Sequence, residues 1–171
     1  MRFCVIVDGT NFINRLFDMG RDKCFILNEL SFPKIAESIQ QLLVENGLPA
    51  LYNGTDFYFS NKKISNLTKS ETDQLLNKLR YERGVTVEQV GIITDGKEKA
   101  LDTSIIIRMF EVMDYYDIMV LLASDRDYIP AFELLRKNGK YVITVGCREN
   151  HPVELINKSY LFLEIDNILK N

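Results

Sequence analysis

The sequence lacks the features of an exported or membrane-spanning protein. Its longest strongly apolar stretch, residues 118–123, is far shorter than the roughly 18 residues needed to cross a bilayer, and Asp8 interrupts the apolar start too early for a signal peptide. Cysteine is scarce: Cys4, Cys24 and Cys147 are odd in number and form no C-x-x-C pair, which argues against a disulfide framework and a zinc ribbon. We therefore expect a cytoplasmic protein with no membrane partner.

An excess of positive charge is also missing. The chain has 24 Asp and Glu residues against 21 Lys and Arg, a formal net charge of −3 and a pI near 5.3. Such a protein does not hold nucleic acid by bulk charge, so a polyanionic partner would have to meet local cations. The candidate cations, for which a solvent-exposed face is the simpler interpretation, are Lys62, Lys63, Lys69, Lys78, Arg80 and Arg83.

Several catalytic motifs are absent as well. His151 is the only histidine and precedes Pro152 at an expected helix start, which argues against Ser-His-Asp and Cys-His chemistry. The chain has no Walker loop, and Gly9 is not followed by the glycine spacing of a dinucleotide fingerprint. A phosphatase that forms an aspartyl phosphate would usually have a second aspartate where this chain has Thr10. The sequence therefore disfavours ATP, NAD and an aspartyl phosphate.

What the sequence does contain is an alternation of short apolar runs and helical patterns. Its 171 residues are 46% hydrophobic and 26% charged, with no internal repeat or composition break, which is typical of one compact domain. We predict a single three-layer α/β domain over residues 1–171 with a mainly parallel central sheet covered by helices. The predicted strands are residues 3–7, 56–60, 90–94, 118–123 and 141–145; the predicted helices are residues 11–19, 33–46, 72–83, 101–116, 129–138 and 152–157; and residues 61–70 are predicted to form a mobile surface loop.

Acidic residues follow the predicted strands. Asp8 comes directly after the first strand, Asp102 opens the helix after the third, and Asp125 and Asp127 follow the fourth. Ligands of an open parallel sheet bind outside the carboxyl ends of the strands, so these carboxylates can share one crevice. Like charges brought together need a neutralising cation, and carboxylates with water are the ligands that Mg²⁺ and Mn²⁺ prefer. The pattern therefore predicts a metal site.

Each acid also has a simpler interpretation. Asp125 or Asp127 can cap the helix that follows, and Asp102 can lie in a first turn where it favours the helix dipole. The set is harder to explain in this way, because the two neighbouring aspartates cannot both be the same cap and Asp8 follows a buried strand. Asn11 is either an N-cap or a neutral group that orients a carboxylate or a phosphate.

Three short motifs occur in order along nearly the whole chain. They are Val7-Asp8-Gly9-Thr10-Asn11, Lys99-Ala100-Leu101-Asp102, and the block from Tyr116 through Ser124-Asp125-Arg126-Asp127 to Pro130. Together they resemble the NYN domains, which belong to the PIN-like nucleases. The resemblance implies a PIN-like parallel sheet, a divalent-metal site and RNA as the usual substrate. Carried over by position, Asp8, Asp102, Asp125 and Asp127 are the metal-site acids and Asn11 is a polar neighbour.

Two positions depart from the family pattern. Ser124 stands where relatives commonly have glycine, and an acid often found near the end of the domain is replaced within residues 158–160. The four core acids are retained.

We therefore predict a metal-dependent endoribonuclease that acts on RNA, expected to be single-stranded. Mg²⁺ or Mn²⁺ held by the four acids would activate water and stabilise charge on the attacked phosphate. Lys99 and Arg126 stand beside the acids, where they can contact the substrate backbone, although Arg126 can equally pair with a neighbouring carboxylate. The alternatives are a non-catalytic RNA-binding or protein-interaction module and a phosphohydrolase of small phosphate esters. A homo-oligomer is compatible with the sequence.

Overall fold

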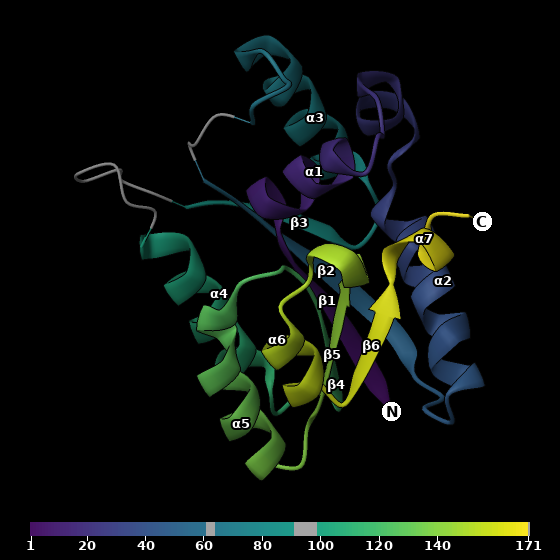
Figure 1. Ribbon diagram of the computed structural model, residues 1–171, viewed down its shortest axis with the longest axis vertical. Coiled ribbons are helices and arrows are strands. Elements are labelled where there is room, and N and C mark those ends of the chain that lie inside the picture. Colours follow the sequence, from purple (N-terminus) through teal and green to yellow (C-terminus); the bar gives the residue numbers. More distant parts are fainter. Residues whose placement is uncertain (61–63, 91–98, 171) are drawn as a thin grey trace.

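Six parallel strands form one sheet at the centre of the molecule (Figure 1). The computed structural model describes residues 1–60, 64–90 and 99–170, with Lys99 described by its backbone alone. The strand order is β3-β2-β1-β4-β5-β6, so the chain builds outward from β1 in one direction and from β4 in the other. The strands are β1 (Arg2–Asp8), β2 (Leu51–Ser60), β3 (Val85–Val90), β4 (Ile118–Leu122), β5 (Tyr141–Gly146) and β6 (Leu161–Glu164).

Helices cover both faces of the sheet and complete three layers (Figure 1). One face carries α1 (Gly9–Asp18), α2 (Phe32–Glu45), α3 (Lys69–Tyr81) and α7 (Ile165–Ile168), and the other carries α4 (Lys99–Val112), α5 (Ile129–Lys137) and α6 (Val153–Lys158). Short helical turns are η1 (Phe25–Glu29), η2 (Arg126–Tyr128) and η3 (Arg148–Asn150). The predicted three-layer α/β fold is confirmed.

The central strand β1 belongs to both hydrophobic cores. Phe3 and Val5 pack into the core on the α1 side, whereas Cys4 and Ile6 pack into the core on the α4 side. Side chains of a strand alternate between faces, so a strand that is buried on both sides has a nearly continuous apolar run. The same alternation directs Asp8 toward the α4 side. Packing on both faces therefore fixes where the first acid lies.

Two expectations about the edge strands need correction. The third strand lies at Val85–Val90, earlier than the predicted strand at 90–94, and residues 91–94 lie outside the described residues. Its alternation of half-buried and exposed side chains is typical of an edge strand, which an apolar run does not reveal. Residues Leu161–Glu164, which are not among the five predicted strands, form β6, a sixth strand beside β5. The sheet is therefore wider than predicted and entirely parallel.

The predicted mobile surface loop at 61–70 needs partial correction: residues 64–68 lie outside helices and strands, as predicted, but they are not wholly on the surface. Residues 61–63 lie outside the described residues, but Ile64 and Leu67 are buried in the core on the α1 side, and Lys69 already begins α3. The lysine-containing sequence suggested a solvated segment because its two apolar side chains are isolated among polar ones.

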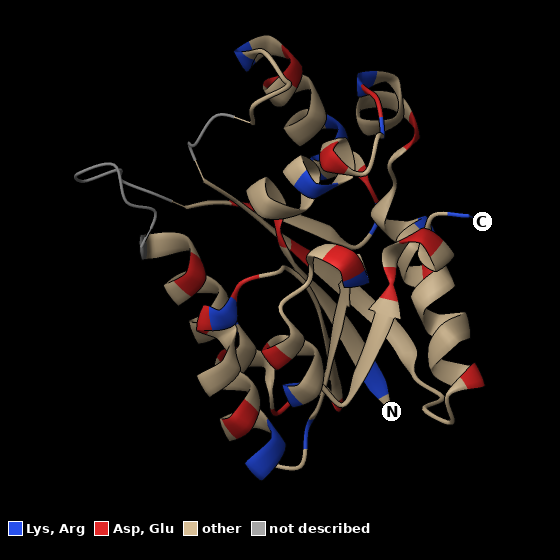
Figure 2. Cartoon of the chain, in the orientation of Figure 1, with Lys and Arg blue, Asp and Glu red and all other residues tan. Residues whose placement is uncertain are grey.

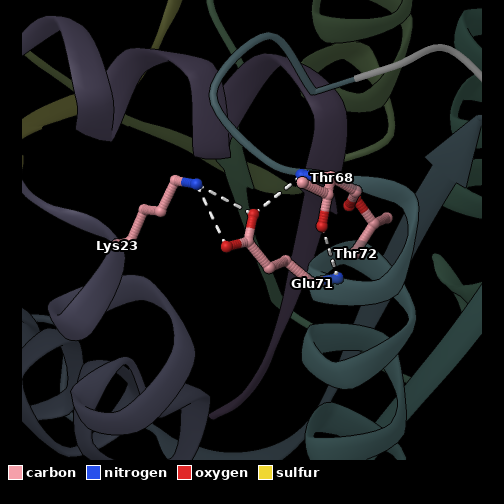
Figure 3. Close-up of polar contacts among 4 residues, drawn as sticks. All are labelled: Lys23, Thr68, Glu71 and Thr72. Carbon is pink, nitrogen blue, oxygen red and sulfur yellow. Dashed lines mark hydrogen bonds and ion pairs between the residues drawn. The ribbon is translucent and has the colours of Figure 1, made fainter.

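A capping box begins α3 and attaches it to the segment before η1 (Figure 3). The Thr68 hydroxyl accepts a hydrogen bond from the Glu71 backbone N–H at 3.2 Å, and the Glu71 carboxylate accepts one from the Thr68 N–H at 2.8 Å. Lys23 Nζ lies 3.0 Å from both carboxylate oxygens of Glu71. The backbone hydrogen bond from Thr68 and the ion pair with Lys23 lower the pKa of Glu71. The capping box and the ion pair thus connect the first turn of α3 to the segment before η1.

Charged residues of both signs are interspersed along the helices (Figure 2). In the described part of the chain, no helix combines the length and the apolar character needed to cross a membrane.

Candidate active site

An open cleft lies at the carboxyl edge of the sheet, where β1 and β4 are neighbours. The strand order reverses between these two strands, because β2 follows β1 on one side and β5 follows β4 on the other. Loops diverge at such a switch point and leave a crevice, which is where ligands of open α/β sheets bind. The residues that line it are Asp8, Thr10, Asn11, Asn14, Arg15, Asp18, Leu101, Asp102 and Asp125.

Asp8 is the last residue of β1 and caps α1. Its side chain is buried, with 5% of the residue exposed, and its Oδ1 accepts a hydrogen bond from the Asn11 backbone N–H at 3.0 Å. The turn is tight: a β-carbon at Gly9 would lie 2.6 Å from the Tyr58 carbonyl oxygen, so a larger residue does not fit. The glycine therefore lets α1 begin directly after the strand.

Asp102, Asp125 and Asp127 bring their carboxylates together on the α4 side. Asp102 lies in the first turn of α4, and the other two belong to the turn after β4. One oxygen from each lies within 4.8 Å of the others. Asp125 is also the N-cap of η2, since its Oδ1 accepts the Asp127 backbone N–H at 2.9 Å. The capping interpretation and the clustering interpretation of this acid are therefore compatible.

Tyr128 connects this cluster to Asp8. Its side chain is fully buried, and its hydroxyl donates a hydrogen bond to Asp102 Oδ1 at 2.9 Å and lies 3.5 Å from Asp8 Oδ2. Burial and the negative charges of Asp8 and Asp102 raise the pKa of Tyr128 far above its usual value. The phenol is therefore neutral and acts as a donor to the carboxylates. Sequence reasoning missed this role, because an aromatic residue after Asp127 looks like an ordinary core residue.

The donor set suits a hard divalent cation. Opposite oxygen ligands of one Mg²⁺ ion lie about 4.2 Å apart and those of Ca²⁺ up to about 5 Å apart, so oxygens within 4.8 Å need only small movements to share an ion. The cluster contains carboxylates and neither thiolate nor imidazole, which favours Mg²⁺, Mn²⁺ or Ca²⁺ over zinc. Asp102, Asp125 and Asp127 are the residues best placed to hold it, with Asp8 adjacent through Tyr128.

The residues expected to contact substrate have different surroundings. Asn11 is not the N-cap of α1; its side-chain oxygen accepts a hydrogen bond from the Ser124 hydroxyl at 3.0 Å. Arg126 is exposed and lies 3.5 Å from the Glu154 carboxylate, as the alternative interpretation of this residue expected. The side chain of Lys99 lies outside the described residues. The serine that departs from the family pattern therefore anchors Asn11 at the cleft.

Of the other candidate cations, those that the structure describes belong to α3 or follow it. Lys62 and Lys63 lie outside the described residues, whereas Lys69 and Arg80 are exposed on α3, which packs on the face opposite the acidic cluster. Lys78 donates a hydrogen bond to the Leu30 carbonyl, and burial lowers its pKa. Arg83 is an exposed residue that follows the helix. Lys69, Arg80 and Arg83 therefore fit the interpretation of a solvent-exposed face, whereas Lys78 has a partner within the protein.

His151 lies behind the cleft rather than in it. Its ring is buried beside Gly146, where a β-carbon would lie 2.3 Å from Nδ1, and its centroid lies 5.0 Å from that of the Phe162 ring, with the two planes tilted by 53°. Burial, together with the positive charge of Arg15, lowers its pKa to about 4. The histidine is therefore neutral near pH 7, which supports a structural role.

The cleft also contains residues that the motifs did not single out. Arg15 and Asp18 lie on its wall in the last turn of α1, and Asn14 has a buried side-chain oxygen with no hydrogen-bond partner in the described part of the chain. A helical spacing from Asn11 was the available signal, since residues three or four positions apart share a helix face.

Comparison with known sequences decides the family. The sequence matches the NYN domain family over residues 2–166, nearly the whole chain. The chain belongs to the NYN domain family. This NYN domain has the nuclease-like fold of the PIN-like superfamily, with the acidic cluster described above.

Comparison with solved structures shows the same fold. A crystal structure of a protein of unknown function from Vibrio parahaemolyticus RIMD 2210633 superposes with a TM-score of 0.61 and 17% identity, covering 98% of this chain and 94% of the other. No curated protein matches the sequence of this chain.

Proposed function

We propose that this NYN domain is a metal-dependent endoribonuclease that hydrolyses phosphodiester bonds in single-stranded RNA. The observation that carries the proposal is the convergence of Asp102, Asp125 and Asp127, with oxygens within 4.8 Å of one another, beside Asp8 at the strand-order reversal. These acids are accessible to solvent, so a cation bound to them could also contact a phosphate group of the substrate. We also infer a cytoplasmic location, where the three free cysteines would stay reduced.

In this proposal, each residue of the cleft has its own role. Asp102, Asp125 and Asp127 hold the cation, and Tyr128 orients Asp102 through its hydrogen bond. Asp8 adds negative charge beside them, fixed by its role as the cap of α1. When bound, Mg²⁺ or Mn²⁺ supplies stabilisation of charge at the phosphate and activation of water for attack. Asn11, held by Ser124, is a neutral group at the cleft that can hydrogen-bond a phosphate oxygen.

The test is cleavage of a circular single-stranded RNA, which only an endonuclease can open. Purified protein is incubated with the RNA in Mn²⁺, in Mg²⁺ and in EDTA, beside a generic phosphate ester. We expect metal-dependent opening of the RNA by the wild type and a loss of at least a hundredfold in Asp125→Asn. The matched control is Asp114→Asn, which makes the same change at an exposed residue after α4, before β4 begins.

Three results would contradict the proposal. RNA that is bound but never cut would favour the non-catalytic binding module. Hydrolysis of the ester without RNA cleavage would favour the small-molecule phosphohydrolase. Equal cleavage by the wild type and Asp125→Asn would assign the activity to a contaminant or to another site.

A further inference from the structure

Arg15 is the positively charged residue on the wall of the acidic cleft. Among the cleft-lining residues of the described chain, the others are neutral or acidic, and the acids are Asp8, Asp18, Asp102 and Asp125. Arg15 lies one helical turn after Asn11 on α1, so both side chains share the helix face that borders the cleft. Its side chain is 41% exposed and therefore accessible to a ligand in the cleft.

Two contacts orient the guanidinium. Its Nε donates to the Ser124 hydroxyl at 3.4 Å, and Nη1 lies 3.6 Å from the Asp18 carboxylate. No contact within the described residues uses Nη2. Asp18 is largely exposed, and exposed ion pairs add little to stability, so folding alone does not explain the arrangement. These two contacts place the guanidinium beside the cleft, and part of its hydrogen-bonding capacity remains unused.

We propose that Arg15 is a substrate-positioning residue that binds a phosphate of the RNA chain next to the acidic cluster. This inference rests on the proposed function. A planar guanidinium presents paired donors that match phosphate oxygens, which a lysine ammonium does not. The protein carries a net charge of −3, and the cleft contributes four acids, so an RNA phosphate needs a fixed positive charge there besides the cation.

The first test is the salt dependence of RNA binding. Wild type, Arg15→Gln and the control Arg80→Gln bind a labelled single-stranded RNA with Ca²⁺ in place of Mn²⁺, and a denaturing gel verifies that the RNA stays intact. Arg80 is an exposed residue near the end of α3, on the face away from the cluster. We expect Arg15→Gln to bind about tenfold more weakly or worse. The slope of log affinity against log salt should fall by about 0.7, the value for one phosphate contact in a single strand.

The second test separates phosphate binding from a structural role. Arg15→Gln should bind Mn²⁺, measured by calorimetry, as tightly as the wild type or more tightly, because a positive charge near the carboxylates is removed. Arg15→Lys should keep the salt slope of the wild type but bind RNA more weakly, because the positive charge remains and the paired N–H donors of the guanidinium are lost.

Each contrary outcome has one meaning. If the wild type binds no RNA, both this inference and the proposed function fail. If the wild type binds RNA and Arg15→Gln binds it equally well with the same slope, the inference fails alone. If Arg15→Gln loses Mn²⁺ binding, Arg15 supports the structure of the site, and the phosphate role is overturned.

Discussion

Replacing Asp125 with asparagine tests the acidic cluster through stability, without any assumption about substrate. The change removes one negative charge from three carboxylates whose oxygens lie within 4.8 Å of one another. It keeps the shape of the side chain and the cap of η2, because an asparagine oxygen can accept the Asp127 backbone N–H at the same place. Any effect on melting therefore reports the charge.

The expected size follows from the separation and the exposure of the groups. At an effective dielectric of 20, two unit charges at 4.8 Å repel by about 3.5 kcal/mol. Asp127 is exposed and Asp125 is partly exposed, so solvent screening reduces the net gain on removing one charge to about 1 kcal/mol. For a chain of this size, that gain raises the melting temperature by about 2–4 °C. We therefore expect Asp125→Asn to melt above the wild type in EDTA.

Adding Mn²⁺ should reverse this order. At ten times its dissociation constant, the ion stabilises the wild type by about 1.4 kcal/mol, or about 3–6 °C, and a variant that lacks one ligand gains much less. Calorimetric melts of both proteins in EDTA and in Mn²⁺ make the comparison, with Asp114→Asn as the control for losing a surface acid. Equal Mn²⁺ shifts would remove Asp125 from the site. A lower melting temperature of Asp125→Asn in EDTA would refute the repulsion argument.

Three further predictions concern single side chains. Tyr128→Phe should lower the melting temperature in EDTA by an amount equivalent to about 1–2 kcal/mol, because Asp102 loses a buried donor; an unchanged melt would contradict this. The pKa of His151 is about 4 in the folded protein and 6.5 in the unfolded chain. Its contribution to stability is therefore present above pH 6.5 and is lost as the pH falls toward 4. The melting temperature of His151→Gln should fall less steeply between pH 6.5 and pH 4 than that of the wild type. Thr68→Ala removes the cap of α3 and should cost about 1 kcal/mol in a denaturant titration, whereas Ser70→Ala at an exposed neighbour should cost much less.

The sequence predicted the interior of the fold better than its edges. Strands buried on both faces, such as β1 and β4, are apolar runs that local pattern reveals. The edge strand β3 alternates half-buried and exposed residues, so the apolar-run criterion placed it too late. The π-helical turn η1 was not predicted, because its geometry depends on packing rather than on a recognisable spacing.

In the candidate site, the positions of residues along the chain were predictable, but the contacts between distant residues were not. The positions of Asp8 and Asp125 after their strands, and thus at one edge of the sheet, could be inferred from the sequence. The contact of the Tyr128 hydroxyl with Asp102 and its approach to Asp8 could not, because they join residues far apart in the chain whose spacing carries no signal. Arg15 was missed for a similar reason: its partner Ser124 lies on the turn after β4.

The acids of the cleft come from different elements of the chain, because the connection from β3 to β4 runs through α4. Asp102 is carried by the helix that leaves the β3 edge of the sheet and leads to β4, whereas Asp125 follows β4 itself. The two carboxylates meet where α4 packs against η2, on the face of the sheet that β1 and β4 form side by side. A ligand that bridges them therefore opposes separation of α4 from the turn after β4 as well as local opening of a loop. In native-state hydrogen exchange, its binding should slow the exchange of amides throughout the central strands, far from the atoms it touches.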